Sequence, residues 1–119
     1  MQIAMIGTGY VGLVTGACFS EFGAVVTCVD SDKVKIERLN NGEIPIFEPG
    51  LEALVKSNVK AGRLFFSCDL RTAVANSDAV FIAVGTPSRR GDGHADLTYV
   101  FSAAKEIAKA LDGYTLVVT

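Results

Sequence analysis

Three glycines at the end of the first apolar run constrain the fold of this chain most strongly. The run covers residues 2–6, and glycines follow at positions 7, 9 and 12. A mostly apolar stretch, residues 10–22, comes next, with Gly12, Gly16 and Ser20 spaced four residues apart. Residues at this spacing share one face of a helix. The pattern predicts a strand, a tight glycine turn and a helix that packs closely against the strand.

Strand-like runs and helical patterns alternate along the rest of the chain. We expect strands at 24–29, 64–67, 79–84 and 114–119, and helices at 32–40, 49–58, 69–76 and 96–111. Strands that alternate with helices form a parallel sheet with right-handed crossovers. The expected fold class is therefore α/β, a Rossmann-type doubly wound parallel sheet, truncated after about five strands because such sheets usually have six.

Particular residues predict where these helices begin. Asp30 or Ser31 can cap the helix at 32–40, and Pro49 suits the first position of the next helix, where its missing N–H does no harm. Asp69 opens the short helix at 69–76, and Asp96 caps the last one. The apolar positions of that last helix match one amphipathic face, and they are Leu97, Val100, Phe101, Ala104, Ile107, Ala108 and Leu111.

Composition excludes several classes of protein. The 119 residues have room for one domain, residues 1–119, and half of them are apolar, which argues against disorder. Eleven Lys and Arg against thirteen Asp and Glu leave a net charge of −2, without the basic excess of a nucleic-acid-binding protein. Cys18, Cys28 and Cys68 are odd in number and widely spaced, and His94 is the lone histidine. Neither a disulfide framework nor a metal site is expected.

The two ends of the chain predict its location and its context. The first residues lack the basic segment of a signal peptide, and no apolar run approaches the ~18 residues of a membrane span. We therefore expect a cytoplasmic protein that contacts no membrane. The sequence stops in or just after the fifth strand, which would leave an apolar edge uncovered. This end predicts that the chain is a piece of a longer protein.

The glycine-rich turn fits the pattern G-x-G-x-x-G, and its context favours a dinucleotide site over a turn without a ligand. It follows a strand and opens a helix, and Asp30 ends the next strand 18 residues beyond Gly12, near the expected interval of about 20. Gly7 permits the tight turn, Gly9 lets the backbone approach a pyrophosphate, and Gly12 allows close helix–strand packing. Free N–H groups at the helix start bind the pyrophosphate. Asp30 would accept hydrogen bonds from the adenosine ribose and repel a 2′-phosphate, so NAD is expected rather than NADP.

Other candidate residues leave alternatives open. Lys35 can reach the ribose and phosphates or point into solvent, and Gly85 and Thr86 follow the fourth strand, either near the cofactor or in an ordinary turn. Glu48 precedes a helix start, where capping is favoured over catalysis. The cysteines suit the core better than catalysis, although Cys68 is the least certain. Arg89, Arg90 and His94 occupy a loop that is solvated, an interface or a moving lid. No catalytic constellation emerges.

Several motifs together resemble the UDP-glucose/GDP-mannose dehydrogenase family. They cover essentially the whole chain and are I-G-T-G-Y-V-G-L at 6–13, V-D at 29–30, K-I at 35–36, L-N-N-G at 39–42, P-I-F-E-P-G-L at 45–51 and V-G-T-P-S at 84–88. The segment G-H-A-D-L at 93–97 resembles the bacterial UDP-glucose 6-dehydrogenase branch of the family. The resemblance implies cofactor-binding residues, namely Gly7, Thr8, Gly9, Tyr10, Val11 and Gly12 for the pyrophosphate, Asp30 and Lys35 for the ribose, and Gly85 and Thr86 nearer the nicotinamide.

The resemblance also implies an activity that this segment lacks on its own. Family members oxidise a sugar C6 alcohol to a carboxylate with two NAD+ and a cysteine thiohemiester, which serves nucleotide-sugar metabolism and polysaccharide biosynthesis. That cysteine, a Ser-Thr cofactor segment, the central helix of the dimer contact and the sugar-nucleotide domain all lie beyond residue 119. None of the cysteines here inherits the catalytic role. A UDP-sugar would bind only to the full-length protein, which is expected to be a homodimer or larger homo-oligomer.

Three alternatives to a UDP-glucose enzyme stay open. A GDP-mannose or UDP-amino-sugar dehydrogenase would share nearly every motif. A stand-alone NAD-sensing module would bind the cofactor without chemistry, and a flavoprotein would share only the glycine pattern.

Overall fold

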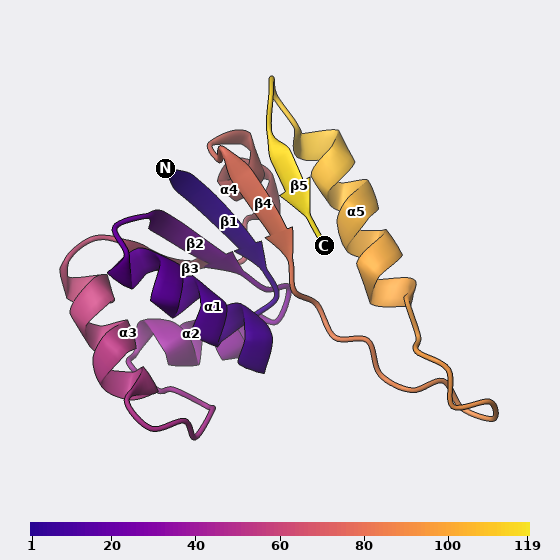
Figure 1. Ribbon diagram of the computed structural model, residues 1–119, viewed down its shortest axis with the longest axis horizontal. Coiled ribbons are helices and arrows are strands. Elements are labelled where there is room, and N and C mark those ends of the chain that lie inside the picture. Colours follow the sequence, from indigo (N-terminus) through magenta and orange to yellow (C-terminus); the bar gives the residue numbers. More distant parts are fainter.

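Five parallel strands form one sheet in the order β3-β2-β1-β4-β5 in the computed structural model, which describes residues 1–119 (Figure 1). The elements follow one another as β1 (Gln2–Ile6), α1 (Tyr10–Glu21), β2 (Val25–Val29), α2 (Lys33–Asn40), α3 (Leu51–Lys60), β3 (Leu64–Ser67), α4 (Leu70–Ala75), β4 (Ala79–Ile82), α5 (Thr98–Ala110) and β5 (Leu116–Val118). The predicted α/β, doubly wound parallel sheet is confirmed.

Strand β1 lies at the centre of the sheet, where the winding reverses. Its last residue, Ile6, is in register with Val29 of β2 on one side and with Ile82 of β4 on the other. The helices that follow β1 and β4 therefore leave toward opposite faces of the sheet. In open α/β sheets, ligands bind at the carboxyl ends of the strands beside this switch point.

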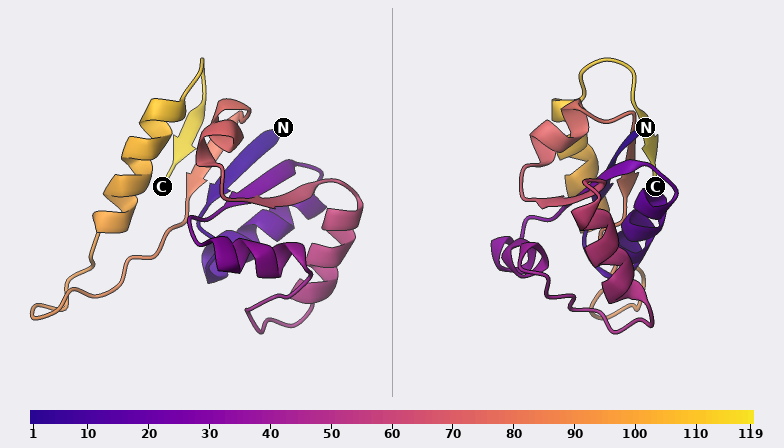
Figure 2. Two further views of the ribbon diagram at one scale, coloured as in Figure 1. Left: turned by 180° about the vertical axis from the view of Figure 1, so that it is seen from behind. Right: turned by 90° about the vertical axis from the view of Figure 1, so that its left-hand side faces the viewer.

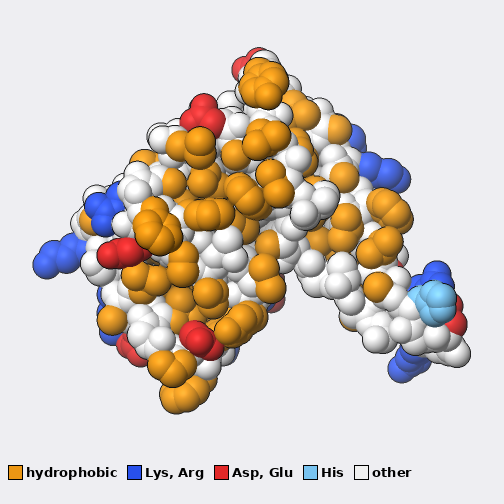
Figure 3. Space-filling model, viewed as in Figure 1, with side chains coloured by type: hydrophobic (Ala, Val, Ile, Leu, Met, Phe, Trp, Pro, Cys, Tyr) orange, Lys and Arg blue, Asp and Glu red, His pale blue; other side chains and the backbone are white.

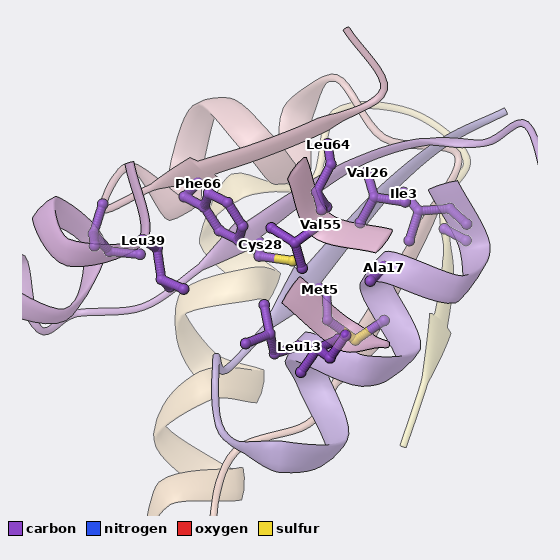
Figure 4. Packing of buried hydrophobic residues seen from close by; sticks show 13 residues of the cluster. Ile3, Met5, Leu13, Ala17, Val26, Cys28, Leu39, Val55, Leu64 and Phe66 are labelled. Carbon is purple, nitrogen blue, oxygen red and sulfur yellow. The ribbon is translucent and has the colours of Figure 1, made fainter. Parts of the chain in front are cut away.

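Two apolar clusters cover the two faces of the sheet. Helices α1, α2 and α3 contribute to the larger one, in which Leu13 and Ala17 of α1 pack over Met5 and Cys28 (Figure 4). Helices α4 and α5 contribute to the other, around Val80 of β4. Strand β1 supplies residues to both clusters, because successive side chains of a strand point to opposite faces.

The small residues of α1 face the sheet as predicted. A Cβ atom added to Gly16 would lie 2.8 Å from the Cys28 sulfur, and Ser20 is fully buried. A larger side chain at either position would hold the helix away from the strands. The four-residue spacing thus sets the distance between α1 and the sheet.

The predicted starts of helices α2 and α5 are wrong. Helix α2 is capped by Asp32, whose carboxylate accepts from the N–H groups of Val34 and Lys35, rather than by Asp30 or Ser31. Asp30 does not cap α2 because its side chain binds elsewhere. Helix α5 begins at Thr98, two residues after its predicted start, with Leu97 at its N-cap and the Asp96 carboxylate accepting from Thr98 N–H at 2.9 Å. Asp69, in contrast, caps α4 as predicted.

Pro49 does not occupy the first position of α3, which begins at Leu51. Instead, the Leu51 N–H donates to the Glu48 carbonyl, and Gly50 has a φ of 81°. This is a type II turn, with proline at its second position and glycine at its third. The turn needs the positive φ that glycine adopts readily, so the proline shapes the entry to the helix rather than its first turn.

Helix α5 buries only part of the apolar face predicted for it, because Ile107 is buried and Val100 is half-buried. Ala104 and Ala108 of that face are exposed. The residues against the sheet are Ala103, Ile107 and Ala110, whereas Phe101 is 61% exposed. Leu97 and Leu111 are also exposed. The exposed apolar face continues onto the edge strand β5, and apolar side chains are visible over both elements (Figure 3).

A long arm separates β4 from α5. The strand ends at Ile82, two residues before its predicted end, and the chain then runs away from the sheet and back (Figure 2). Ser88 pairs with Ala95 in an antiparallel bridge, and the Asp96 N–H donates to the Pro87 carbonyl at 2.6 Å. The arm is therefore hairpin-like at its tip. No helix in the structure has the length and apolar character needed to cross a membrane.

Candidate dinucleotide-binding site

The β1–α1 turn lies directly against the backbone that leaves β4. Gly7 has a φ of 111°, and its N–H donates to the Val29 carbonyl at 2.7 Å. A Cβ on Gly7 would lie 2.5 Å from the Ala83 carbonyl oxygen, and a Cβ on Gly12 would lie 1.9 Å from the Gly7 carbonyl oxygen. Both positions therefore require glycine, as the spacing predicts.

Gly9 differs from its two neighbours because it has free space around it. It is the N-cap of α1, no side chain caps the helix, and an added Cβ would meet nothing within 4 Å. The first intrahelical bond at this end joins Leu13 N–H to the Gly9 carbonyl. The N–H groups of Tyr10, Val11 and Gly12 precede that bond and have no acceptor within the helix. An open, donor-rich helix start fits the diphosphate of a dinucleotide.

Asp30 lies at the end of β2, beside this turn, and binds it directly. Its Oδ2 atom accepts from the Thr8 hydroxyl at 2.7 Å and from the Thr8 N–H at 3.2 Å, while Oδ1 accepts from the Asp32 N–H at 3.0 Å. Thr8 is fully buried. The carboxylate is therefore held in one orientation, with its exposed edge available for hydroxyl donors.

These contacts also determine the ionisation of Asp30. Partial burial alone would raise the pKa of its carboxyl group, but the hydrogen bonds from Thr8 and Asp32 and the charge of Lys35 outweigh that effect. The pKa lies below its usual value, so Asp30 is an anion at neutral pH. An anion here would accept from ribose hydroxyls and would disfavour a 2′-phosphate.

Lys35 is brought to the same place by helix α2. Because Asp32 caps this helix, Lys35 falls in its first turn, and its Nζ atom lies 3.7 Å from Asp30 Oδ2. The side chain is 35% exposed. The structure therefore places Lys35 beside the predicted ribose site rather than far out in solvent.

Gly85 and Thr86 lie at the start of the arm, and both are exposed. They follow Ala83, which contacts Gly7, so they come from the correct edge of the sheet. An added Cβ on Gly85 would meet nothing within 4 Å. That these two residues line the nicotinamide half of the site stays a prediction.

The remaining candidates do not join this site. Cys28 is fully buried, and burial raises the pKa of its thiol to about 12, which leaves it protonated. Cys18 is half-buried and Cys68 is exposed. His94, Arg89 and Arg90 lie on the exposed arm, where Arg89 pairs with Asp92; the histidine is visible at the tip in Figure 3. No three His, Cys, Asp or Glu residues are grouped as a metal site would require.

Glu48 has a partner that sequence reasoning missed. Its carboxylate was expected to cap a helix, but it accepts instead from the Tyr10 hydroxyl at 3.0 Å. Helix α3 has no side-chain cap. The two residues are 38 positions apart, so no local signal could have predicted their pairing.

Comparison with known proteins agrees with this geometry. The model of the UDP-glucose/GDP-mannose dehydrogenase family, NAD binding domain, matches residues 1–119. UDP-glucose 6-dehydrogenase of Rhizobium meliloti (strain 1021) is 68% identical over 119 residues, which are 100% of this chain and 27% of that protein. UDP-glucose 6-dehydrogenase TuaD of Bacillus subtilis (strain 168) is 55% identical over 117 residues, or 98% of this chain and 25% of that protein.

A solved structure supports the same assignment. The crystal structure of a ternary complex of GDP-mannose dehydrogenase from Pseudomonas aeruginosa matches with a TM-score of 0.88 and 44% identity. The match covers 92% of this chain and 25% of that one. The chain thus spans about a quarter of the length of the relatives that it matches. It belongs to the UDP-glucose/GDP-mannose dehydrogenase family, whose NAD-binding domain it represents.

Proposed function

We propose that this chain holds NAD at the switch point of its sheet, on behalf of a dehydrogenase that oxidises the C6 alcohol of UDP-glucose. The observation that carries the proposal is the Asp30 carboxylate, held by Thr8 beside the uncapped N-terminus of α1. The residues proposed to bind the cofactor are Gly7, Thr8, Gly9, Tyr10, Val11, Gly12, Asp30, Lys35, Gly85 and Thr86.

Each part of the site would bind a different part of the cofactor. The N–H groups at the start of α1 would hold the diphosphate, since the helix dipole and the open space at Gly9 both favour it. Asp30 would accept from the adenosine ribose, with Lys35 balancing its charge. Gly85 and Thr86 would line the nicotinamide half. The bound NAD supplies the hydride acceptor of the reaction.

Residues 1–119 form one NAD-binding domain in this proposal and are expected to be inactive alone. The only fully buried thiol, that of Cys28, has a pKa of about 12 and packs in the core. His94 lies on the exposed arm. The catalytic cysteine and the sugar-nucleotide site would therefore come from a longer protein. Its cytoplasmic location, homo-oligomeric assembly and role in polysaccharide biosynthesis stay predictions.

The choice of UDP-glucose rests on the relatives, and a sibling substrate is the second candidate. Both relatives named above are UDP-glucose 6-dehydrogenases, whereas the solved structure is a GDP-mannose dehydrogenase. We expect the full-length protein to reduce NAD+ with UDP-glucose and not with GDP-mannose or a UDP-amino sugar. Turnover of GDP-mannose alone would favour the sibling activity, and turnover by residues 1–119 would contradict the assignment of catalysis elsewhere.

The cofactor site is tested by titrating this chain with NADH and NADPH and following nucleotide fluorescence. Asp30→Asn should weaken NADH binding by about tenfold or more, because a hydrogen bond to a charged group contributes roughly 1.5–3 kcal/mol. The same variant should bind NADPH relatively better, since the like charge facing the 2′-phosphate is gone. Asparagine is preferable to alanine, because it keeps an acceptor for the buried Thr8 hydroxyl.

Asp32→Asn is the matched control. It removes the same charge two residues away, while asparagine still caps a helix as well as aspartate does. The control should keep the preference of the wild type for NADH over NADPH. Equal behaviour of the two variants would contradict the role of Asp30, and absence of NADH binding by the wild-type chain would refute the proposed site altogether.

A further inference from the structure

A hydrogen bond joins the first residue of α1 to the loop between α2 and α3. The Tyr10 hydroxyl donates to Glu48 Oε2 at 3.0 Å, although both residues are exposed. The hydrogen bond that Tyr10 donates and the nearby negative charge of Glu48 raise the pKa of the Tyr10 hydroxyl. Tyr10 directly follows Gly9, so the backbone of Tyr10 lies in the first turn of α1, where the diphosphate is proposed to bind.

The loop of residues 43–50 has few other attachments. Its backbone bonds are local, from Glu43 N–H to the Arg38 carbonyl at one end and within the turn at Glu48 and Leu51 at the other. Ile44 and Ile46 pack partly against the core. Phe47, which follows Ile46 and precedes the turn at Glu48, is 99% exposed. The side chain of Glu48 is thus the polar tether between this loop and α1.

We propose that Glu48 is a positioning residue for the cofactor, which acts by holding the Tyr10 side chain and the loop of residues 43–50 beside the N-terminus of α1. In this position the loop forms one wall of the diphosphate site and slows the departure of the bound dinucleotide. The inference rests on the proposed binding of NAD at the glycine-rich turn. It assigns a role to a carboxylate that does not cap a helix and does not touch Asp30.

The negative charge of Glu48 and its hydrogen bond to Tyr10 have opposite expected effects on NADH binding, which makes the proposal testable. A carboxylate near a diphosphate repels it, so removal of the charge by itself should strengthen NADH binding. Loss of the tether should instead let the loop open and increase the dissociation rate. Tyr10→Phe removes the same hydrogen bond without removing the charge. The two substitutions therefore agree in sign only if the hydrogen bond is what matters.

The experiment measures the dissociation rate of NADH from this chain by stopped-flow fluorescence. Glu48→Ala, which leaves no acceptor for the tyrosine, and Tyr10→Phe should each raise that rate by about two- to tenfold, the range expected for one hydrogen bond of modest net strength. The double variant should be no faster than either single variant, because both remove one interaction. Tyr99→Phe and Glu37→Ala are the controls, since they remove the same chemical groups from α5 and from an exposed position of α2.

A spectroscopic measurement separates positioning from a general loss of structure. The chain has three tyrosines, and their ionisation is followed by ultraviolet absorbance as the pH rises. In Glu48→Ala, one of the three should ionise at a lower pH than in the wild type, while the circular dichroism stays unchanged. This result would show that the bond exists in solution and that its loss leaves the fold intact.

Each outcome supports or overturns the inference. Faster dissociation in both single variants, without additivity, supports it. Unchanged rates, additive effects, or tighter binding by Glu48→Ala would overturn it while leaving the Asp30 site standing. If the wild-type chain binds no NADH, the proposed function fails and the role of Glu48 fails with it.

Discussion

Substitution of Gly9 and Gly12 by alanine separates the ligand-binding role of the glycine-rich turn from its structural role. The two residues lie three positions apart, but only Gly12 is in close contact. A Cβ on Gly12 would lie 1.9 Å from the Gly7 carbonyl oxygen, whereas a Cβ on Gly9 would meet nothing within 4 Å. Gly9 has a φ of −74°, which alanine adopts without strain. The same chemical change should therefore have different consequences.

Gly12→Ala should destabilise the fold. Heavy atoms pack at about 3.5–4.0 Å, so α1 would have to retreat from the turn by at least about 1 Å. Overpacking of this kind costs roughly 1–3 kcal/mol, and the better helix propensity of alanine offsets about 1 kcal/mol. Because the contact is with a backbone carbonyl rather than a flexible side chain, we expect a net loss of about 2 kcal/mol. That loss lowers the Tm by about 6–10 °C for a domain of this size.

Gly9→Ala should instead leave stability nearly unchanged and weaken cofactor binding. Alanine caps a helix less well than glycine, but it restricts the unfolded chain, which contributes about 0.4–1 kcal/mol in the other direction. The Tm should stay within about 5 °C of the wild type. Its methyl group would occupy the space that the diphosphate needs, so NADH affinity should fall by at least about tenfold.

Thermal unfolding followed by circular dichroism and NADH titration below the Tm are the two assays. Gly16→Ala is the control, because it adds the same methyl group to the same helix, against the Cys28 sulfur and far from the turn. It should lower the Tm without changing NADH affinity once the variant is folded. A wild-type Tm for Gly12→Ala would refute the packing argument, and wild-type affinity for Gly9→Ala would refute the placement of the diphosphate.

Three further outcomes follow from particular residues. The pKa of Asp30 is lowered in the folded state, so the ionised carboxylate stabilises the fold. This stabilisation is complete above the pKa that Asp30 has in the unfolded chain, and it is lost as the pH falls through the pKa in the folded chain. Urea unfolding of Asp30→Asn should therefore lose less stability than the wild type between about pH 5 and pH 2, and an identical pH profile would contradict this. Asn58→Ala should cost about 2–4 kcal/mol in the same assay, since Asn58 is fully buried and accepts two hydrogen bonds from Arg63; a loss below 1 kcal/mol, about the value of one ordinary bond, would refute it. Iodoacetamide should label the exposed Cys68 in the folded chain but label Cys28, whose pKa is about 12, only after unfolding, as peptide mass spectrometry can verify.

Strong local signals predicted most of the fold. Alternation of apolar runs and helical patterns was enough to predict a parallel sheet, because only a few connections between such elements pack well. The glycine spacing and Asp30 predicted the site for a similar reason, since the turn and the following strand end meet wherever this sheet forms. Asp69 was identified as a cap because the relevant bond spans only three residues.

Helix α5 shows where local periodicity is insufficient. Its predicted apolar positions share one face, but Ala103 and Ala110 extend the apolar surface further around the helix. The pattern therefore identifies a helix but does not choose which part of that surface is buried. The sheet selected the side with Ala103, Ile107 and Ala110, and left Phe101 in solvent. Small side chains let α5 approach the strands closely, which a count of apolar positions does not measure.

The sequence by itself determined the order of elements, the glycine turn and the acidic residue that ends β2, because each depends on residues close together in the chain. Tertiary structure alone decided that Asp30 would hold Thr8 rather than cap α2, and that Glu48 would pair with Tyr10 rather than cap α3. In any sequence, a carboxylate at a helix start can accept a hydrogen bond from the first backbone N–H groups of that helix. Only the folded chain brings a distant donor close enough to compete for it.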